Sequence, residues 1–237
     1  MDVSLVIPAY NEEGFIGPCL DSVLKNAPGK FKEIIVVDNA STDGTAKEAS
    51  SRAGVRVVHE PLKGLTHARQ KGLEASSSEY IAFIDADERI PPDWIEKIEY
   101  YFAHYPDAVV LTGPLRYYDG SFFARWLIII GPWILLPFAL LIGGHWIIGG
   151  NFVARRSALL AIGGFDTSVA FYGEDANLGR RLSKVGPWLF KMDFNLYTSA
   201  RRLNAEGAIR THVRYILNYL FQSILRRSHT RAYTDVR

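Results

Sequence analysis

Short apolar runs alternate with longer amphipathic segments through the first half of this chain. Four runs rich in β-branched or aromatic residues predict buried strands, which cover 3–7, 33–37, 55–58 and 80–84. Helical spacing of apolar residues predicts helices between them, at 12–25, from a cap at Ser41 or Thr42 to about residue 53, and at 66–75. Pro8 is expected to end the first strand; a further helix from Pro91 to about Tyr105 and a strand at 108–112 follow. This alternation predicts an α/β fold with a parallel sheet flanked by helices.

Polar residues cluster where the predicted strands end. Tyr10-Asn11-Glu12 follows the first strand, Asp38-Asn39 the second, and Asp85-Ala86-Asp87 the fourth. In an open parallel sheet, ligands bind at the carboxyl ends of the strands. We therefore expect a functional site along this edge of the sheet.

Two carboxylates at the end of the fourth strand suggest a metal site. Side chains at positions i and i+2 of a strand project to one side, so Asp85 and Asp87 lie together, with Glu88 beside them. Oxygen-only ligands suit Mg²⁺ or Mn²⁺, which keep open positions for phosphate oxygens. The alternative is a solvated acidic turn, because this short pattern is common.

Composition narrows the class of protein. The 237 residues are 48% hydrophobic and 22% charged, which excludes a disordered chain and predicts one domain with an appendage. Cys19 is the single cysteine, which excludes an internal disulfide and any multi-cysteine metal site. The net charge of +2 gives no sign of nucleic-acid binding, and the N-terminus does not resemble a secretory signal.

Charge is unevenly distributed, which raises the question of a membrane. No Asp, Glu, Lys or Arg occurs in the 29 residues between Arg125 and Arg155, whereas residues 201–237 hold 8 Arg against 2 acidic residues. Apolar positions of that tail fall at helical spacing, as in a basic amphipathic helix on an anionic lipid surface: Ile209, Val213, Ile216, Leu217, Leu220, Ile224 and Leu225. A buried helix pair, an oligomer contact or a groove for a partner helix are the alternatives.

Several segments resemble, in order, the motifs of the family 2 glycosyltransferases, which have the GT-A fold. The resemblance covers about residues 2–185 and rests on segments 3–12, 34–45, 63–72, 85–87, 149–152, 163–166 and 173–175. It implies inverting transfer of a sugar from a nucleotide-diphosphate sugar, with UDP as the favoured nucleotide. It also implies a divalent metal ion, Mg²⁺ or Mn²⁺, that neutralises charge on the leaving diphosphate.

The resemblance assigns donor-binding residues by position. Pro8, Ala9, Tyr10 and Glu12 fall where the family cradles the nucleoside, and Asp38 where a carboxylate binds the base. Asn39 stands where a second Asp is frequent, so contact with the ribose is in doubt there. Asp85 is expected to contact the ribose or a metal-bound water, and Asp87 to ligate the metal. The remaining candidates for binding the nucleotide-sugar are Lys63, Gly64, Arg69 and Arg202, the last chosen from the pair Arg201-Arg202 because a guanidinium suits a diphosphate.

Asp175 matches the family's catalytic base. An inverting transfer needs a carboxylate that takes the proton of the acceptor hydroxyl. Asp175 is expected just before a helix at 176–184, where the helix dipole would lower its pKa. The alternative is an ordinary acidic residue at a helix start. His212 is a candidate third metal ligand, although a lone histidine is more often structural.

Membrane attachment is expected to involve two elements. The metal pair and the base lie on either side of the uncharged block, so this block cannot be a single membrane span; a short hairpin at Trp126–Ile142, broken at Pro132 and Pro137, would lie in the interface instead. We expect a GT-A domain at 1–200, with this insertion at about 122–148, and a basic amphipathic tail at 201–237.

The sequence thus predicts a metal-dependent glycosyltransferase on the cytoplasmic side of the cell membrane, attached peripherally. Its acceptor is expected to be lipid-linked or another glycan. The processive members' Gln-x-x-Arg-Trp motif is missing, which favours transfer of one sugar per acceptor. Alternatives are a degenerate nucleotide-binding or membrane-partner module, and a nucleotidyltransferase of similar fold.

Overall fold

A computed structural model describes residues 1–122, 124–126, 128, 145, 147–169 and 172–225 of the chain. Within the last helix, the side chains of residues 208, 209, 212 and 223–225 are not described. Most of the predicted interfacial hairpin, the side chain of the candidate metal ligand His212 and the tail beyond residue 225 therefore lie outside what the structure describes.

A mixed sheet of seven strands forms the centre of the molecule, in the order β3-β2-β1-β4-β8-β6-β9. The strands are β1 (Val3–Ala9), β2 (Glu33–Asp38), β3 (Val55–His59), β4 (Tyr80–Ile84), β6 (Val110–Thr112), β8 (Asn151–Arg155) and β9 (Trp188–Phe190). Only β8 runs antiparallel to its neighbours, β4 and β6. The α/β prediction with a mostly parallel sheet is confirmed.

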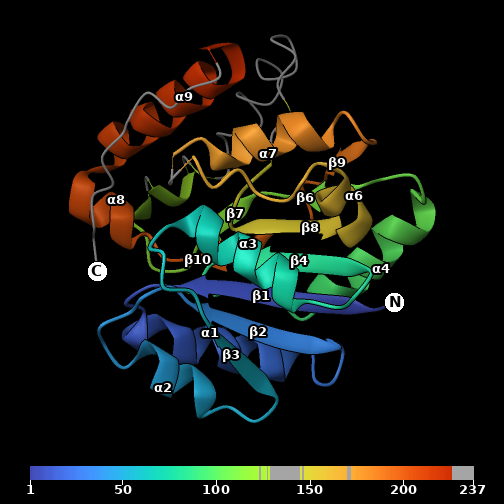
Figure 1. Cartoon of the computed structure of the whole chain (residues 1–237). Helices are drawn as coiled ribbons and strands as arrows, with labels where there is room; N and C mark the ends of the chain where they lie inside the picture. The colour runs from blue at the N-terminus through green and yellow to red at the C-terminus, as the bar shows by residue number, and fades with distance from the viewer. Residues whose placement is uncertain (123, 127, 129–144, 146, 170–171, 226–237) are drawn as a thin grey trace.

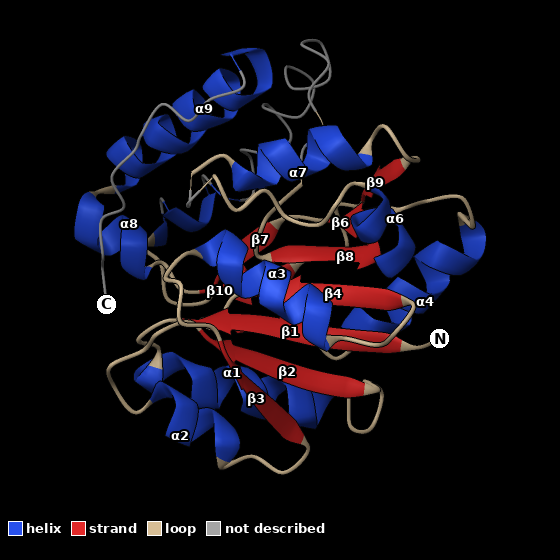
Figure 2. Cartoon of the chain, in the orientation of Figure 1, coloured by secondary structure: helices blue, strands red, loops and turns tan. Residues whose placement is uncertain are grey.

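Helices cover both faces of this sheet (Figures 1 and 2). One face packs against α1 (Glu13–Asn26), α2 (Thr45–Ser50) and α4 (Trp94–His104). The other packs against α3 (Leu65–Ala75), α6 (Arg156–Ala161) and α7 (Glu174–Leu182). Alternate residues of β1 supply the two cores, with Leu5 and Ile7 on the first face and Val6 on the second, which explains why the strand is apolar throughout.

Strand register brings the predicted site residues together. Ala9 pairs with Asp38, and the Asn39 N–H donates to the Ala9 carbonyl at 2.8 Å, so β1 and β2 end side by side. The antiparallel strand β8 begins where β4 ends, since Asn151 pairs with Ile84. The two glycines before Asn151 consequently reach the same edge of the sheet as Asp85.

A small second sheet and two C-terminal helices complete the described chain. The sheet has the order β5-β10-β7, from Glu88–Arg89, Leu196–Thr198 and Leu115–Tyr117. Helix α8 (Arg201–Glu206) lies on the side toward which β1 points, and α9 (Ala208–Leu225) continues past α7 (Figure 1). No helix among the described residues is long and apolar enough to cross a membrane.

The predicted C-terminal helix is confirmed as α9, but its buried face is polar. Thr211, Asn218 and Gln222 are almost fully buried, whereas Val213 is 49% exposed. Of the apolar positions that the sequence placed against lipid, Val213 is thus exposed, whereas Ile216, Leu217 and Leu220 are half-buried.

Two predicted element boundaries are wrong. Pro8 lies inside β1, paired with Val37; β1 is paired with β4 only as far as Val6, so beyond that point the strand accommodates a proline. Helix α2 begins at Thr45, because Ser41 and Thr42 are engaged elsewhere: the Ser41 hydroxyl accepts from the Asn11 N–H, and the Thr42 N–H donates to the Asn11 side chain.

Candidate functional site

A pocket of about 470 Å³ opens at the carboxyl ends of β1, β2 and β4. Its volume is within the range of small-molecule sites. Ten of the predicted site residues line it: Pro8, Ala9, Tyr10, Glu12, Asn39, Lys63, Gly64, Asp85, Asp87 and Arg202. Three others, Asp38, Arg69 and Asp175, are not among its lining residues.

Asn39 holds the loop that forms one side of the pocket. Its side-chain amide donates to the carbonyls of Glu60 and Leu62, at 3.1 and 2.7 Å, and its oxygen accepts from the Gly64 N–H at 2.7 Å. This loop carries Lys63, whose ammonium lies 3.8 Å from the centre of the Tyr10 ring. Only an amide can donate and accept in this way, so the asparagine that replaces the expected second aspartate shapes the pocket.

Asn39→Asp should destabilise the protein by about 1–3 kcal/mol, because a carboxylate would face two carbonyls whose hydrogen bonds are lost. Urea unfolding would measure the loss. Asn204→Asp, the same change at an exposed position of α8, serves as the control and should be near neutral. Equal stability of the two variants would contradict the assigned role of Asn39.

Asp38 lies at the rim of this region, 7% exposed. One oxygen accepts from the Ser41 N–H at 3.3 Å, and the other lies 3.2 Å from His59 Nδ1. The carboxylate is therefore fixed at the end of β2, next to the loop that Asn39 holds.

Asp87 is the more buried member of the carboxylate pair. Its side chain is 14% exposed and that of Asp85 is 40% exposed. The pKa of Asp87 is raised to about 6, chiefly by burial; the charge of Arg201 opposes this rise, and the charges of Asp85 and Glu12 add to it. The Glu88 carboxylate accepts from the Asp85 N–H and is fully buried, and burial raises its pKa well above the usual range.

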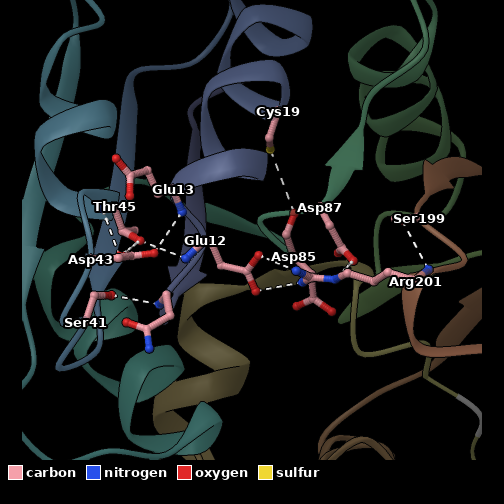
Figure 3. A network of polar contacts seen from close by, with 11 residues as sticks. Glu12, Glu13, Cys19, Ser41, Asp43, Thr45, Asp85, Asp87, Ser199 and Arg201 are labelled. Carbon is pink, nitrogen blue, oxygen red and sulfur yellow. Dashed lines mark hydrogen bonds and ion pairs between the residues drawn. The ribbon is translucent and has the colours of Figure 1, made fainter. Parts of the chain in front are cut away.

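Arg201 bridges two sides of the pocket (Figure 3). It donates two hydrogen bonds of 2.7 Å to the Glu12 carboxylate and a third, from Nε, to Asp87 at 3.0 Å. Its guanidinium also lies 4.2 Å from the centre of the Phe15 ring. Arg202, the predicted donor-binding residue of this pair, lines the pocket and contacts Glu206 at 3.5 Å. Arg201 makes the contacts with the carboxylates.

Asp85 and Asp87 have the chemistry of a divalent-cation site. Among the described residues no group of three His, Cys, Asp or Glu side chains is arranged to hold a metal ion. Both carboxylates nevertheless line the pocket, and burial of Asp87, which raises its pKa, makes its ionised form costly. A cation bound there, completed by diphosphate oxygens and water, would relieve this cost.

Arg69, a predicted donor-binding residue, is buried and does not line the pocket. The side chain is 1% exposed, and its guanidinium contacts Asp85 and Glu174, each at 3.3 Å, and donates to the Gly149 carbonyl at 2.7 Å. Arg69 therefore links the end of β4 to the first turn of α7. Its spacing from Gly72 and Leu73 places it on the buried face of α3, a signal that the sequence contained.

Asp175 lies in the first turn of α7, as expected. Gly173 precedes the helix with a φ of +86°, a conformation that favours glycine. Burial raises the pKa of Asp175, an effect to which the charge of Asp85 adds, while the Ala176 N–H and Arg69 lower it. The expected lowering of this pKa by the helix dipole is thus wrong, because burial outweighs it.

Comparison with known proteins identifies a family and relatives that this chain is similar to. The model of the family described as glycosyl transferase family 2 matches residues 4–163. The lipopolysaccharide core biosynthesis glycosyltransferase LpsC of Rhizobium meliloti is 38% identical over 94 residues, which are 38% of this chain and 33% of LpsC. This chain thus matches about a third of the length of that relative.

Solved structures show the same fold. Mannosyltransferase PcManGT from Pyrobaculum calidifontis, in complex with GDP-Man and Mn²⁺, superposes with a TM-score of 0.70 at 21% identity over 94% of this chain and 63% of that one. Glucosyl-3-phosphoglycerate synthase from Mycobacterium tuberculosis, in complex with Mn²⁺ and UDP-Glc, gives a TM-score of 0.64 at 24% identity over 94% of this chain and 78% of that one.

Proposed function

Because the chain belongs to glycosyl transferase family 2, we propose that it is a metal-dependent, inverting glycosyltransferase that moves one sugar from a nucleotide-diphosphate sugar to an acceptor hydroxyl. The observation that carries this proposal is the contact of Arg69 with both Asp85 and Glu174. One guanidinium joins Asp85, at the end of β4, to the helix turn that bears Asp175, which supports assigning the proposed metal ligands and the proposed base to one site.

The donor nucleotide is proposed to bind between the ends of β1 and β2 and the loop held by Asn39. Tyr10 and Lys63 provide a ring and an ammonium on this side of the pocket, and Asp38 offers a carboxylate for the base. Such a carboxylate accepts from the N–H that uracil and guanine both carry. UDP is the favoured nucleotide; the neighbouring structures described above are complexes with UDP-Glc and GDP-Man.

Asp87 and Asp85 are proposed to hold Mg²⁺ or Mn²⁺, which would neutralise charge on the leaving diphosphate. Both structural neighbours described above contain Mn²⁺. Arg201 contacts Asp87 and Glu12 directly, so it lies beside this position with a guanidinium suited to a diphosphate.

Asp175 is proposed to act as the general base. The acceptor oxygen forms a bond to the anomeric carbon, the bond from that carbon to the diphosphate oxygen breaks, and the nucleoside diphosphate leaves. The acceptor proton passes to the Asp175 carboxylate. A pKa raised by burial makes this carboxylate a stronger base than an ordinary aspartate.

The acceptor is proposed to be lipid-linked, and the protein to lie peripherally on the cytoplasmic side of the cell membrane. At the edge of the uncharged block, Phe122 is 87% exposed and Trp126 is 49% exposed, as suits residues that contact a lipid interface. The relative LpsC is named for lipopolysaccharide core biosynthesis.

Nucleotide diphosphates should stabilise the protein against heat only when Mn²⁺ is present, because Asp85 and Asp87 would hold the cation, which would neutralise charge on the diphosphate. A thermal-unfolding screen of UDP, GDP and ADP with and without Mn²⁺ would measure this, and we expect the largest shift with UDP. Stabilisation by none of the three nucleotides would contradict the proposed function.

A further inference from the structure

The pocket continues past the carboxylates onto a wall whose residues the sequence did not predict to bind the donor. Leu115 and Tyr117 of β7, Leu203 of α8 and Tyr215 of α9 line it, and we call these four residues the leucine–tyrosine wall. Leu203 and Tyr215 lie beyond residue 163, where the family match ends. The wall is therefore completed by helices outside the matched region, and it offers apolar and aromatic surface where the opposite side offers carboxylates.

Arg202 is a positioned cation beside this wall. It lines the same pocket with its side chain 18% exposed, in ion-pair contact with Glu206 at 3.5 Å. Glu206 is held in turn by Arg214 at 2.7 Å, and Arg214 also donates to the Tyr172 hydroxyl at 3.1 Å. A guanidinium fixed in this way is suited to bind a phosphate oxygen.

Exposed aromatic side chains occur in the wall and on the segment that follows β7. Asp119 accepts from the Ser199 hydroxyl and the Ala200 N–H, each at 2.6 Å, which fastens the chain after β7 to the start of α8. Phe122 follows three residues later and is 87% exposed, and Tyr215 of the wall is 42% exposed. A large apolar side chain left open in a pocket, as Tyr215 is, indicates contact with an apolar ligand or surface.

We propose that the leucine–tyrosine wall and Arg202 form the acceptor subsite, and that the acceptor is a sugar joined through phosphate to a hydrocarbon chain. The phosphate binds Arg202, the hydrocarbon lies against the wall, and the sugar hydroxyl extends toward Asp175. The proposal rests on the proposed function, because a general base at Asp175 requires a hydroxyl acceptor rather than a bare lipid phosphate. It goes further in naming the chemical class of the acceptor and the residues that select it.

Binding of farnesyl phosphate, below its micellar concentration and without donor, tests the subsite by calorimetry on the full chain. Arg202→Gln should weaken this binding about ten-fold, as expected for loss of a charge-assisted hydrogen bond, and should leave the weaker binding of farnesol unchanged. Tyr215→Ala should weaken both ligands. Arg210→Gln and Val213→Ala change exposed residues of α9 that do not line the pocket, and they should leave both affinities unchanged.

Three outcomes would overturn the proposal. Inorganic phosphate that binds as tightly as farnesyl phosphate would indicate a simple anion site, and an equal loss in Arg210→Gln would indicate non-specific attraction to the basic helix. If Arg202→Gln weakened the binding of UDP and left the binding of farnesyl phosphate unaffected, Arg202 would be a donor-binding residue instead. UDP stabilisation with Mn²⁺ is measured in parallel, so failure of the proposed function shows as loss of donor binding in the unmodified protein, whereas failure of the subsite leaves it intact.

Discussion

Asp175→Asn is expected to reduce sugar transfer by about 10²–10⁴-fold, because an amide cannot take the acceptor proton. The Asp175 carboxylate accepts a hydrogen bond of 2.7 Å from the Ala176 N–H. Asparagine has the same shape, and its side-chain oxygen can still accept this hydrogen bond. The start of α7 should therefore keep its structure. Initial rates of nucleoside diphosphate release would measure transfer, and thermal stabilisation by UDP with Mn²⁺ would show that donor binding is unchanged.

Asp93→Asn is the matched control for this variant. Asp93 stands at the start of another helix, α4, but it is exposed, is paired with Lys97 at 2.8 Å and does not line the pocket. This control should keep full activity. An Asp175→Asn variant with activity within about three-fold of the control would remove Asp175 from the reaction, since general-base catalysis contributes far more than that.

The pH profile gives an independent check on Asp175. A base acts in its deprotonated form, so transfer should rise as pH rises through its pKa. Because burial raises that pKa, the acid limb should have its midpoint above the value of about 4 that is usual for aspartate.

The sequence predicted the strands of the nucleotide-binding half well, because their apolar runs are local and uninterrupted. It did not show that β8 inserts between β4 and β6. Residues 81 and 154, which pair in the sheet, are more than seventy positions apart in the sequence. An apolar run also does not indicate whether its strand lies parallel or antiparallel to its neighbours. Gly149 and Gly150, which lie next to Asp85 in the structure, could be matched to a motif in the sequence. Their position beside the end of β4 could not be predicted.

The directions in which two arginines point could not be predicted, for a geometric reason. Arg201 and Arg202 are neighbours on α8, and a helix turns about 100° per residue, so they face different partners. Arg201 contacts Glu12 and Asp87, whereas Arg202 contacts Glu206, and composition alone cannot choose between these directions. Arg69 was expected to face phosphate as a basic residue on a helix, but its partners lie 16 and 105 residues away.

The pKa of Asp175 shows a similar limit. Position at a helix start was visible in the sequence and predicted a lowered pKa. Burial under neighbouring elements was not visible, and it reverses the direction of the shift. Local pattern therefore located the residue, and tertiary packing determined its chemistry.

Asp87→Asn should affect stability with opposite signs in the absence and presence of metal. The folded-state pKa of Asp87 is raised from 3.8 to about 6, so the folded protein holds this proton more tightly than the unfolded chain. The stability that this group contributes is fully present below the unfolded pKa and is lost as pH rises through about 6. At pH 7 without metal, the ionised carboxylate costs on the order of 2–3 kcal/mol, which asparagine would remove.

Urea unfolding with EDTA would show this as a metal-free variant more stable than the unmodified protein at pH 7 and similar to it near pH 4. Arg201 keeps its two hydrogen bonds to Glu12 in the variant, so this part of the ion-pair network should remain. With Mn²⁺ and UDP the order should reverse, because only the unmodified protein has both carboxylates for the cation, and transfer should be lost in the variant. Asp93→Asn should show neither effect. A variant that is less stable without metal would mean that the 3.0 Å contact between Arg201 and Asp87 outweighs the cost of burying the carboxylate; a variant that keeps its Mn²⁺-dependent stabilisation would place the cation elsewhere in the pocket.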